Sequence, residues 1–321
     1  MGIRVGTAGW GDPSLIRSGR FYPKGCTSPE ARLRYYASQF PLVEVDSSYY
    51  ALPSARNAEL WAQRTPPGFT FNVKAFRLFT GHQTPPRALP PDITEAMAAH
   101  FDSKRNLYYK DTPDEIRSEL WRRFEAGVRP LQAAGKLNAL HFQFAPWVTP
   151  APDWQRHIEE CVGRMAGYLL AVEFRNRAWF DGRRDATTLQ LERDLGVAHV
   201  VVDEPQASKR SIPQVWAVAA PELVVVRLHG RNEATWEIKG QPDASARFNY
   251  DYSDAELSML AAPIKRLAEQ AQEVHVVFNN NFGDQGQRNA RSLMALLDDA
   301  AMPPILAPAD RAGPAQRQQA G

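Results

Sequence analysis

The chain has 321 residues, of which 44% are hydrophobic and 23% are charged, and its formal net charge is +2. This is the composition of an ordinary globular protein, and the small net charge and two cysteines do not indicate nucleic-acid binding, a disulfide framework or a Cys-rich zinc site. The first ten residues lack the pattern of a signal peptide, and no apolar stretch approaches the roughly 18 residues of a membrane helix, so we expect a cytoplasmic protein without a membrane segment.

Eight short apolar runs recur along the chain, and each has the length and the content of Val, Ile, Leu or Phe that is typical of a β-strand. The runs span residues 3–10, 42–48, 69–75, 137–144, 169–175, 197–203, 222–230 and 274–281. Helical patterns fill most of the intervals between them. Alternation of strands with helices predicts parallel strands joined by right-handed crossovers, and the number eight favours a closed (β/α)8 barrel over an open sheet.

Several helix starts carry a capping signal. Ser28, followed by Pro29, and Ser54 each precede a helical pattern, and capping boxes are expected at Thr112 and Ser253. Further helices are expected over 153–167, 185–195 and from 286 to about 299.

A single barrel domain is expected over residues 1–302, followed by a disordered tail over 303–321. Two segments depart from a minimal barrel. A Pro-rich insertion covers 78–112 after the third strand, and a long loop covers 230–252 after the seventh. Long ordered loops in a compact domain are often functional. His82, in the insertion, could form part of a lid over the barrel.

Polar side chains occupy one face of the predicted strands, near their carboxyl ends. Since strand side chains alternate between two faces, these positions point into the barrel at the end where active sites of this fold lie. The inward set is Glu44, Asp46, Lys74, Gln143, Glu173, Arg175, Asp203, Arg227, His229 and Asn279. On the sixth strand the same alternation places His199 and Asp203 inside and Val200 and Val202 outside. Buried charge is costly unless it is paired or used, so this ring is either a ligand site or a structural network of ion pairs.

The leading interpretation is an enzyme that binds a small phosphorylated or carboxylated compound at this mouth. Arg175, Arg227 and Arg231 are expected to orient the anion, because guanidinium groups bind such groups through paired hydrogen bonds. The base is expected to be Asp46, Glu173 or Asp203, with His229 as the partner acid. Further candidates for ligand contact are Trp10, Glu44, Ser47, Tyr49, Lys74, Arg77, Gln143, Asn279 and Asn280.

Two other classes of function stay open. Glu173, Asp203 and His229 could hold a divalent metal, as in a metal-dependent phosphodiesterase or a barrel that processes nucleic acid. Arg175 and Arg227 lie in the same ring and oppose a bound cation, so we assign no metal ligand and do not favour nucleic acid as a partner. A non-catalytic binding or scaffold protein would use the two long loops, and its barrel mouth would be filled by its own ion pairs.

A series of motifs resembles the YecE-like family, also called domain of unknown function seventy-two. The motifs are GTAGW (6–10), VEVDSSYY (43–50), FNVKAFRLFTGH (71–82), LHFQFAPW (140–147), AVEFRNRAW (171–179), VVDEP (201–205), VRLHGR (226–231) and FNNNFGDQGQRNA (278–290). They occur in order over residues 3–300. The resemblance implies a TIM-barrel fold and no established biochemical activity. Ala145 departs from the family pattern, which has Pro at this position.

Overall fold

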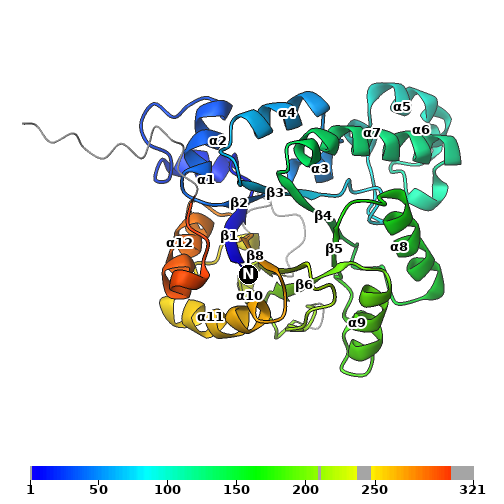
Figure 1. Cartoon of the computed structure of the whole chain (residues 1–321). Helices are drawn as coiled ribbons and strands as arrows, with labels where there is room; N and C mark the ends of the chain where they lie inside the picture. Colours follow the sequence, from blue (N-terminus) through cyan, green and yellow to red (C-terminus); the bar gives the residue numbers. More distant parts are fainter. Residues whose placement is uncertain (1, 209–210, 237–246, 305–321) are drawn as a thin grey trace, which may run out of the picture.

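A closed barrel of eight parallel strands organises the chain (Figure 1). The computed structural model describes residues 2–208, 211–236 and 247–304. Each strand pairs with the next along the chain, and β8 pairs with β1. The strands are β1 (Gly2–Ala8), β2 (Leu42–Val45), β3 (Thr70–Lys74), β4 (Leu137–Gln143), β5 (Leu170–Glu173), β6 (Ala198–Asp203), β7 (Leu223–Leu228) and β8 (Glu273–Phe278). The (β/α)8 barrel predicted from the sequence is confirmed.

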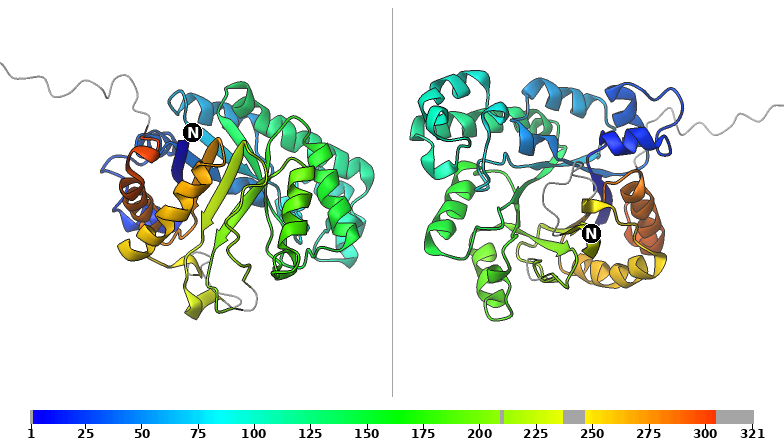
Figure 2. Two further views of the ribbon diagram at one scale, coloured as in Figure 1. Left: turned by 60° about the horizontal axis from the view of Figure 1, so that its bottom comes forward. Right: turned by 180° about the vertical axis from the view of Figure 1, so that it is seen from behind.

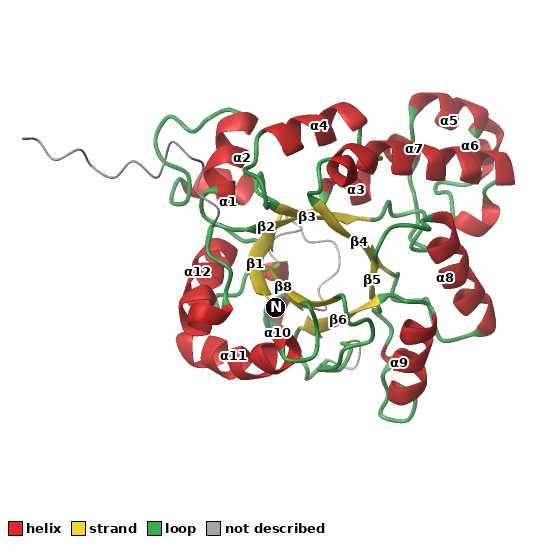
Figure 3. Cartoon of the chain, viewed as in Figure 1, coloured by secondary structure: helices red, strands yellow, loops and turns green. Residues whose placement is uncertain are grey.

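The helices surround the ring of strands, except for one short helix, Glu233–Trp236, which lies at the mouth of the barrel (Figures 2 and 3). They are α1 (Pro13–Ser18), α2 (Pro29–Ala37), α3 (Ser47–Tyr50), α4 (Ala55–Gln63), α5 (Pro91–Ala96), α6 (Ala98–Ser103), α7 (Asp114–Ala133), α8 (Pro152–Arg164), α9 (Asp185–Asp194), α10 (Glu233–Trp236), α11 (Asp254–Ala268) and α12 (Gln285–Leu297). Short 3-10 turns are η1 (Pro86–Ala88), η2 (Tyr109–Asp111), η3 (Arg177–Trp179) and η5 (Asp298–Ala300). Within the described residues, no helix is both long enough and apolar enough to cross a membrane.

Three of the four predicted helix starts are confirmed by their caps. The Ser28 and Ser54 hydroxyls accept hydrogen bonds from the backbone of α2 and α4, and Ser253 forms a complete capping box with Glu256 on α11. The capping box expected at Thr112 is wrong. There α7 begins at Asp114, and the Thr112 hydroxyl donates 2.9 Å back to the Tyr108 carbonyl, so it closes the preceding turn instead.

The predicted insertion over 78–112 is ordered and packs beside α7 (Figure 1). It holds α5, α6, η1 and η2, and its residues Ile93, Leu107 and Tyr109 are buried in the same hydrophobic core as the barrel. A short bridge between Thr84 and Leu107 joins its two arms. The loop predicted over 230–252 contains α10, and its residues 237–246 lie outside the described part of the chain. So do residues 305–321 of the predicted tail.

The register of β6 corrects one part of the inward face. Paired residues of parallel strands share a face, and Val202 pairs with Arg227, whereas Asp203 pairs with Leu228. His199 bonds to Glu192 of α9, 2.9 Å away, so it faces the helices. The expectation that His199 and Asp203 point into the barrel is therefore wrong. His199 and Asp203 do share one face of the strand, but both find their partners outside the barrel, in Glu192 and Arg231, so their polarity indicated the wrong face.

The close approach of β1 to its neighbour β2 depends on Gly6, which pairs with Leu42. A Cβ atom at Gly6 would lie 2.0 Å from the Leu42 carbonyl oxygen, far inside van der Waals contact. That carbonyl also accepts 3.0 Å from the Tyr36 hydroxyl of α2, which fixes its position. Only glycine therefore permits the two strands to approach this closely.

We expect Gly6→Ala to lower the free energy of unfolding by more than about 2 kcal/mol, because backbone rather than a flexible side chain must move. The measurement is chemical denaturation. Gly163→Ala on α8 is the matched control, since its Cβ meets nothing within 4 Å, and it should be neutral or slightly stabilising. Equal stabilities for the two variants would contradict this account of Gly6.

Candidate functional site

Arg227 lies at the centre of a buried ionic network inside the barrel. Its Nη2 is 2.6 Å from Glu44 Oε1 and its Nη1 is 2.7 Å from Glu173 Oε2, and all three side chains are fully buried. His141 touches both acids, at 3.0 Å from Glu44 and 3.1 Å from Glu173. The network therefore links β2, β4, β5 and β7 across the interior.

Both carboxylates of this network are held in the ionised form. Burial is the largest single effect and raises the pKa of Glu44 and Glu173, but the opposing effects, of which the charge of Arg227 is the largest, together outweigh it. Hydrogen bonds from His141 act in the same direction, and the pKa of each acid lies well below its usual range. A carboxylate that cannot take up a proton near neutral pH is a poor general base. The role of base expected for Glu173 does not fit this environment.

Arg175 extends the network towards the mouth. Its Nη1 is 2.9 Å from Glu173 Oε1, and its Nη2 is 2.6 Å from Glu204 Oε2. The other Glu204 oxygen accepts 2.8 Å from the backbone nitrogen of Ile212, which fixes this acid in turn. Two carboxylates therefore hold one guanidinium in a single orientation at the edge of the cavity described below.

His229 is buried beside this guanidinium. Its Nε2 is 3.1 Å from Arg175 Nη1, and its Nδ1 is 2.8 Å from the Asn279 amide. Burial lowers the pKa of His229 to about 3, and the nearby Arg227 charge adds to this effect against the opposing contact with Glu173. The imidazole is neutral at pH 7. A protonated His229 is thus not available as the partner acid that the sequence suggested.

A second cluster surrounds Asp203 on the outer face of the barrel. Arg231 donates to its carboxylate at 2.8 Å through Nη2, and Tyr252 and Gln214 also donate to it. Asn280 is likewise turned away from the mouth, because its amide donates 2.8 Å to the Tyr250 carbonyl. These contacts join the β7–α11 connection to the barrel. Asp203, Arg231 and Asn280 are therefore not brought into the mouth.

A cavity of about 960 Å³ opens at the carboxyl ends of the strands. We call it the mouth cavity. Nine predicted site residues line it: Trp10, Asp46, Ser47, Tyr49, Lys74, Gln143, Arg175, His229 and Asn279. Seven others do not: Glu44, Arg77, Glu173, Asp203, Arg227, Arg231 and Asn280. Arg227 is fully buried and already bound by two carboxylates, so the expectation that it orients a ligand is wrong.

Other lining residues were missed by reasoning on strand alternation. They come from the segments that connect strands and helices, including the short helices α3 and α10, and include Asp12, Tyr50, Trp236, Arg247, Phe248 and Asn281. His82 of the insertion also reaches the mouth cavity, as the sequence suggested. Loop residues have no fixed periodicity, so no local signal marked Arg247 or Phe248 in advance.

Asp46 and Lys74 form a pair on one wall of the mouth cavity. Lys74 Nζ is 3.4 Å from Asp46 Oδ1, and both Nζ and the Arg77 guanidinium carbon lie 5.1 Å from the centre of the Tyr49 ring. Burial raises the pKa of Asp46, and the negative charge of Glu44 beneath it raises the pKa further, against the lowering effect of Lys74. Asp46 is thus the mouth carboxyl best suited to exchange a proton.

Three positive charges act on His82 in the same direction. Burial, followed by the charges of Lys74, Arg77 and Arg175, lowers the pKa of His82 to about 3. Within the part of the chain that the structure describes, neither the Lys74 ammonium nor the Arg77 guanidinium makes a hydrogen bond, and the Gln143 amide makes none either. The mouth cavity therefore presents positive potential and unused donor groups on one side.

The three residues considered as a metal trio do not converge. Glu173 and His229 contact Arg175 and Arg227, and Asp203 lies on the opposite face of its strand. Within residues 2–208, 211–236 and 247–304, no group of three His, Cys, Asp or Glu side chains is placed to hold a metal ion.

Taken together, a closed parallel barrel and a polar cavity at the carboxyl ends of its strands define a (β/α)8 protein with the usual site architecture of that fold. The chain belongs to the family described as Protein of unknown function DUF72, whose profile matches residues 4–314. The family resemblance found in the sequence is confirmed.

Known relatives support this assignment over nearly the whole chain. UPF0759 protein YunF of Bacillus subtilis (strain 168) is 34% identical over 301 residues, which covers 92% of this chain and 95% of YunF. The crystal structure of a DUF72 family protein from Thermotoga maritima MSB8 has a TM-score of 0.71 at 27% identity, covering 92% of this chain and 99% of that one. A DUF72 family protein from Enterococcus faecalis V583 shares the fold, with a TM-score of 0.75 at 24% identity over 95% of this chain and 98% of its own.

We expect Arg227→Met to lower the free energy of unfolding by about 3–5 kcal/mol, because it leaves Glu44 and Glu173 buried without a cation. Glu173→Gln should also destabilise, because it removes one of the two charges that balance the buried Arg227. Arg129→Met on α7 is the control, since that guanidinium is 65% exposed, and its loss should cost less than about 1 kcal/mol. Urea denaturation checks this, and similar small losses for both arginine variants would refute a structural role for the network.

The depressed pKa of His229 makes stability depend on pH. The unfolded chain binds a proton at this residue below about 6.5, whereas the folded chain binds it only near pH 3. The contribution of neutral His229 to the free energy of unfolding is fully present above about pH 6.5 and is lost as the pH falls from there towards pH 3. In the wild type the free energy of unfolding declines as the pH falls, and His229→Gln should make this decline less steep by about 1 kcal/mol per pH unit. His100→Gln on α6 is the control, and an unchanged slope for His229→Gln would contradict the prediction.

Proposed function

We propose that this protein is an enzyme that binds a small phosphorylated or carboxylated compound in the mouth cavity. The observation that carries the proposal is that Lys74 and Arg175 both line the cavity together with His82, while the Arg77 guanidinium lies against the Tyr49 ring of the same wall. Charged oxygens of a phosphate or carboxylate are the natural acceptors for such a group of donors.

The state of these donors supports an anion site over a closed structural network. Lys74 has one ion-pair partner, Asp46 at 3.4 Å, and within the described residues neither its ammonium nor the Gln143 amide, both of which line the cavity, makes a hydrogen bond. A buried donor without a partner costs free energy, and a bound anion would recover it. Arg175 is held by two carboxylates, so it would meet the ligand in a fixed orientation at little further entropic cost.

Asp46 is the proposed acid–base group. Its pKa is raised by burial and by Glu44, which brings it closer to the range in which a carboxyl exchanges protons at neutral pH. Lys74 lies beside it and would stabilise negative charge that develops on the substrate. The arrangement favours a reaction that moves a proton at an atom next to the bound anionic group.

The same geometry bears on the two alternative classes. If the protein were a scaffold whose mouth is filled by its own ion pairs, no cavity would be expected there. A cavity of about 960 Å³ is open instead. A metal-dependent phosphodiesterase requires ligands that converge, and Asp203 is directed away from Glu173 and His229. We place the enzyme in the cytoplasm as part of the same proposal, because Cys26 and Cys161 are both free, as is usual in a reducing compartment.

Isothermal titration calorimetry with inorganic phosphate, ribose 5-phosphate and citrate tests the anion site. We expect at least one of them to bind, and Lys74→Gln to weaken that binding by about tenfold or more, which corresponds to about 1.4 kcal/mol. Asp46→Asn should bind as tightly as the wild type or more tightly, because it removes negative charge next to Lys74. Lys265→Gln, an exposed lysine on α11, is the matched control and should not change binding.

Two outcomes would count against this site. The first is the absence of saturable binding for all three anions at millimolar concentration. The second is binding that Lys74→Gln and Lys265→Gln weaken equally, which would show a diffuse charge effect rather than a site in the mouth cavity.

A further inference from the structure

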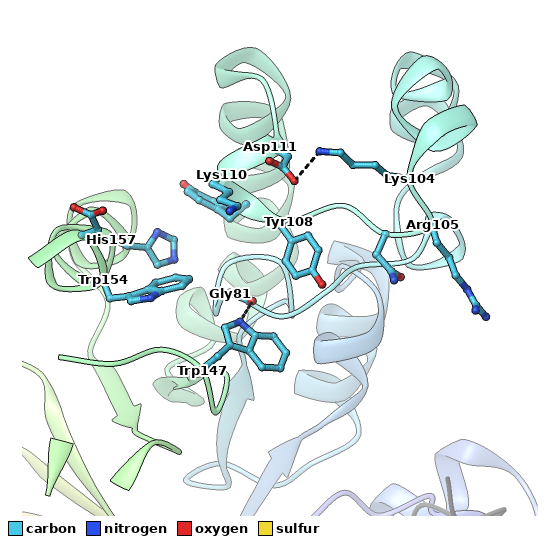
Figure 4. Close-up of a pocket in the computed structure, with 12 residues that line it drawn as sticks. Gly81, Lys104, Arg105, Tyr108, Lys110, Asp111, Trp147, Trp154 and His157 are labelled. Carbon is cyan, nitrogen blue, oxygen red and sulfur yellow. Dashed lines mark hydrogen bonds and ion pairs between the residues drawn. The ribbon is translucent and has the colours of Figure 1, made fainter. Parts of the chain in front are cut away.

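A second cavity, of about 870 Å³, lies beside the mouth cavity (Figure 4). It is bounded by the insertion on one side and by the start of α8 with the preceding loop on the other. We call it the aromatic groove and define it by Lys104, Tyr108, Lys110, Trp147, Trp154 and His157. None of these residues takes part in the site proposed above.

The aromatic rings of the groove are held in place by Gly81. The Trp147 indole nitrogen donates 3.0 Å to the Gly81 carbonyl, yet 46% of the Trp147 side chain is exposed. Gly81 has a positive φ of +78°, and a Cβ there would lie 3.1 Å from the Trp154 ring. Only glycine therefore lets both indoles approach this loop. In Figure 4 the rings of Tyr108, Trp147 and Trp154 surround one common space.

Polar groups of the groove have unused hydrogen-bonding capacity. Within the described residues, the Tyr108 hydroxyl, the Trp154 indole nitrogen and the Lys110 ammonium have no hydrogen-bond partner. Lys104 is paired with Asp111 at 3.4 Å, whereas Lys110 has no ion pair in that part of the chain. The groove thus combines exposed aromatic faces with an uncompensated positive charge.

A single aromatic wall separates the groove from the mouth cavity. His82 lines the mouth cavity, Trp147 lines the groove, and their ring centres lie 5.8 Å apart. The two cavities are neighbouring but distinct, and each has its own cations.

We propose that the aromatic groove binds a nucleotide unit, that is, a planar base that carries a phosphate. The base stacks on the exposed indole of Trp147 and contacts Trp154 and Tyr108, and the phosphate lies near Lys110. Stacking of bases on aromatic side chains, combined with phosphate contacts to cations, is the general way in which proteins hold unpaired nucleotides. A neutral sugar would use the rings but would leave the positive charge unmatched. This inference goes beyond the proposed function, because it concerns a different cavity.

The first test is a fluorescence and calorimetric titration of the full chain with adenosine monophosphate and, separately, with a short single-stranded oligothymidylate. We expect saturable binding of at least one of them, and Trp147→Ala to weaken it by about tenfold or more. Lys110→Glu should weaken it by a similar factor at low salt and by less at high salt, because the phosphate contact is electrostatic. Lys265→Glu on α11 is the matched control and should leave the affinity within about twofold.

Tight binding of the oligonucleotide with weak binding of the mononucleotide would support the inference and identify the source as a strand, and the reverse would identify it as a free nucleotide. Thermal unfolding of each variant shows whether it folds. Lys110→Glu changes an exposed side chain, so it still tests the groove if Trp147→Ala does not fold.

Several results would overturn the inference. One is the absence of saturable binding of either probe up to about 5 mM, because a dissociation constant above this value is weaker than that of an ordinary ligand site. Another is equal weakening by Lys110→Glu and Lys265→Glu. Binding of an oligogalacturonate but of neither nucleotide probe would assign the groove to acidic sugars instead. Nucleotide binding that Lys74→Gln abolishes and Trp147→Ala spares would place the ligand in the mouth cavity, which overturns this inference and leaves the proposed function standing.

Discussion

The ion pairs of Arg227 with Glu44 and Glu173 are the constraint on which the interior of this barrel depends. Three charges that are fully buried can exist together only because each is within 2.7 Å of an opposite charge. His141 makes a hydrogen bond with Glu173 at 3.1 Å and lies 3.0 Å from Glu44. An interior filled in this way differs from one filled by branched apolar side chains, because its stability requires every member to be present.

The same network controls the chemistry of the surface above it. Glu44 lies below Asp46 and helps to raise its pKa, while Glu173 shares Arg175 with Glu204 and so fixes a cation at the edge of the mouth cavity. Burial, reinforced by the positive charge of Arg227, lowers the pKa of His229 and keeps that imidazole neutral. Residues that no ligand can reach therefore set the protonation and orientation of those that a ligand would meet.

The insertion over 78–112 gives the barrel a second set of surfaces. It places His82 on the mouth cavity, and Tyr108 and Lys110 on the aromatic groove. The insertion is anchored where the Phe79 ring stacks on Trp121 of α7, with their centres 3.6 Å apart. Because this segment is tied to the helical layer, the wall between the two cavities is part of the folded structure rather than an appendage.

The sequence alone determined the eight strands, their closure into a barrel and the polar positions at six strand ends, because apolar alternation and capping are local signals. It did not determine the phase of β6, where His199 and Asp203 find their partners outside the barrel, nor which charges pair. Glu44 and Arg227 are 183 residues apart, and their contact exists only once the barrel closes. Whether a charge is satisfied depends on neighbours that folding brings from distant parts of the chain. Only the tertiary structure therefore shows that the charges of Arg227 and Asp203 are satisfied by neighbours. It also shows that the donors of Lys74 and Arg77 remain available.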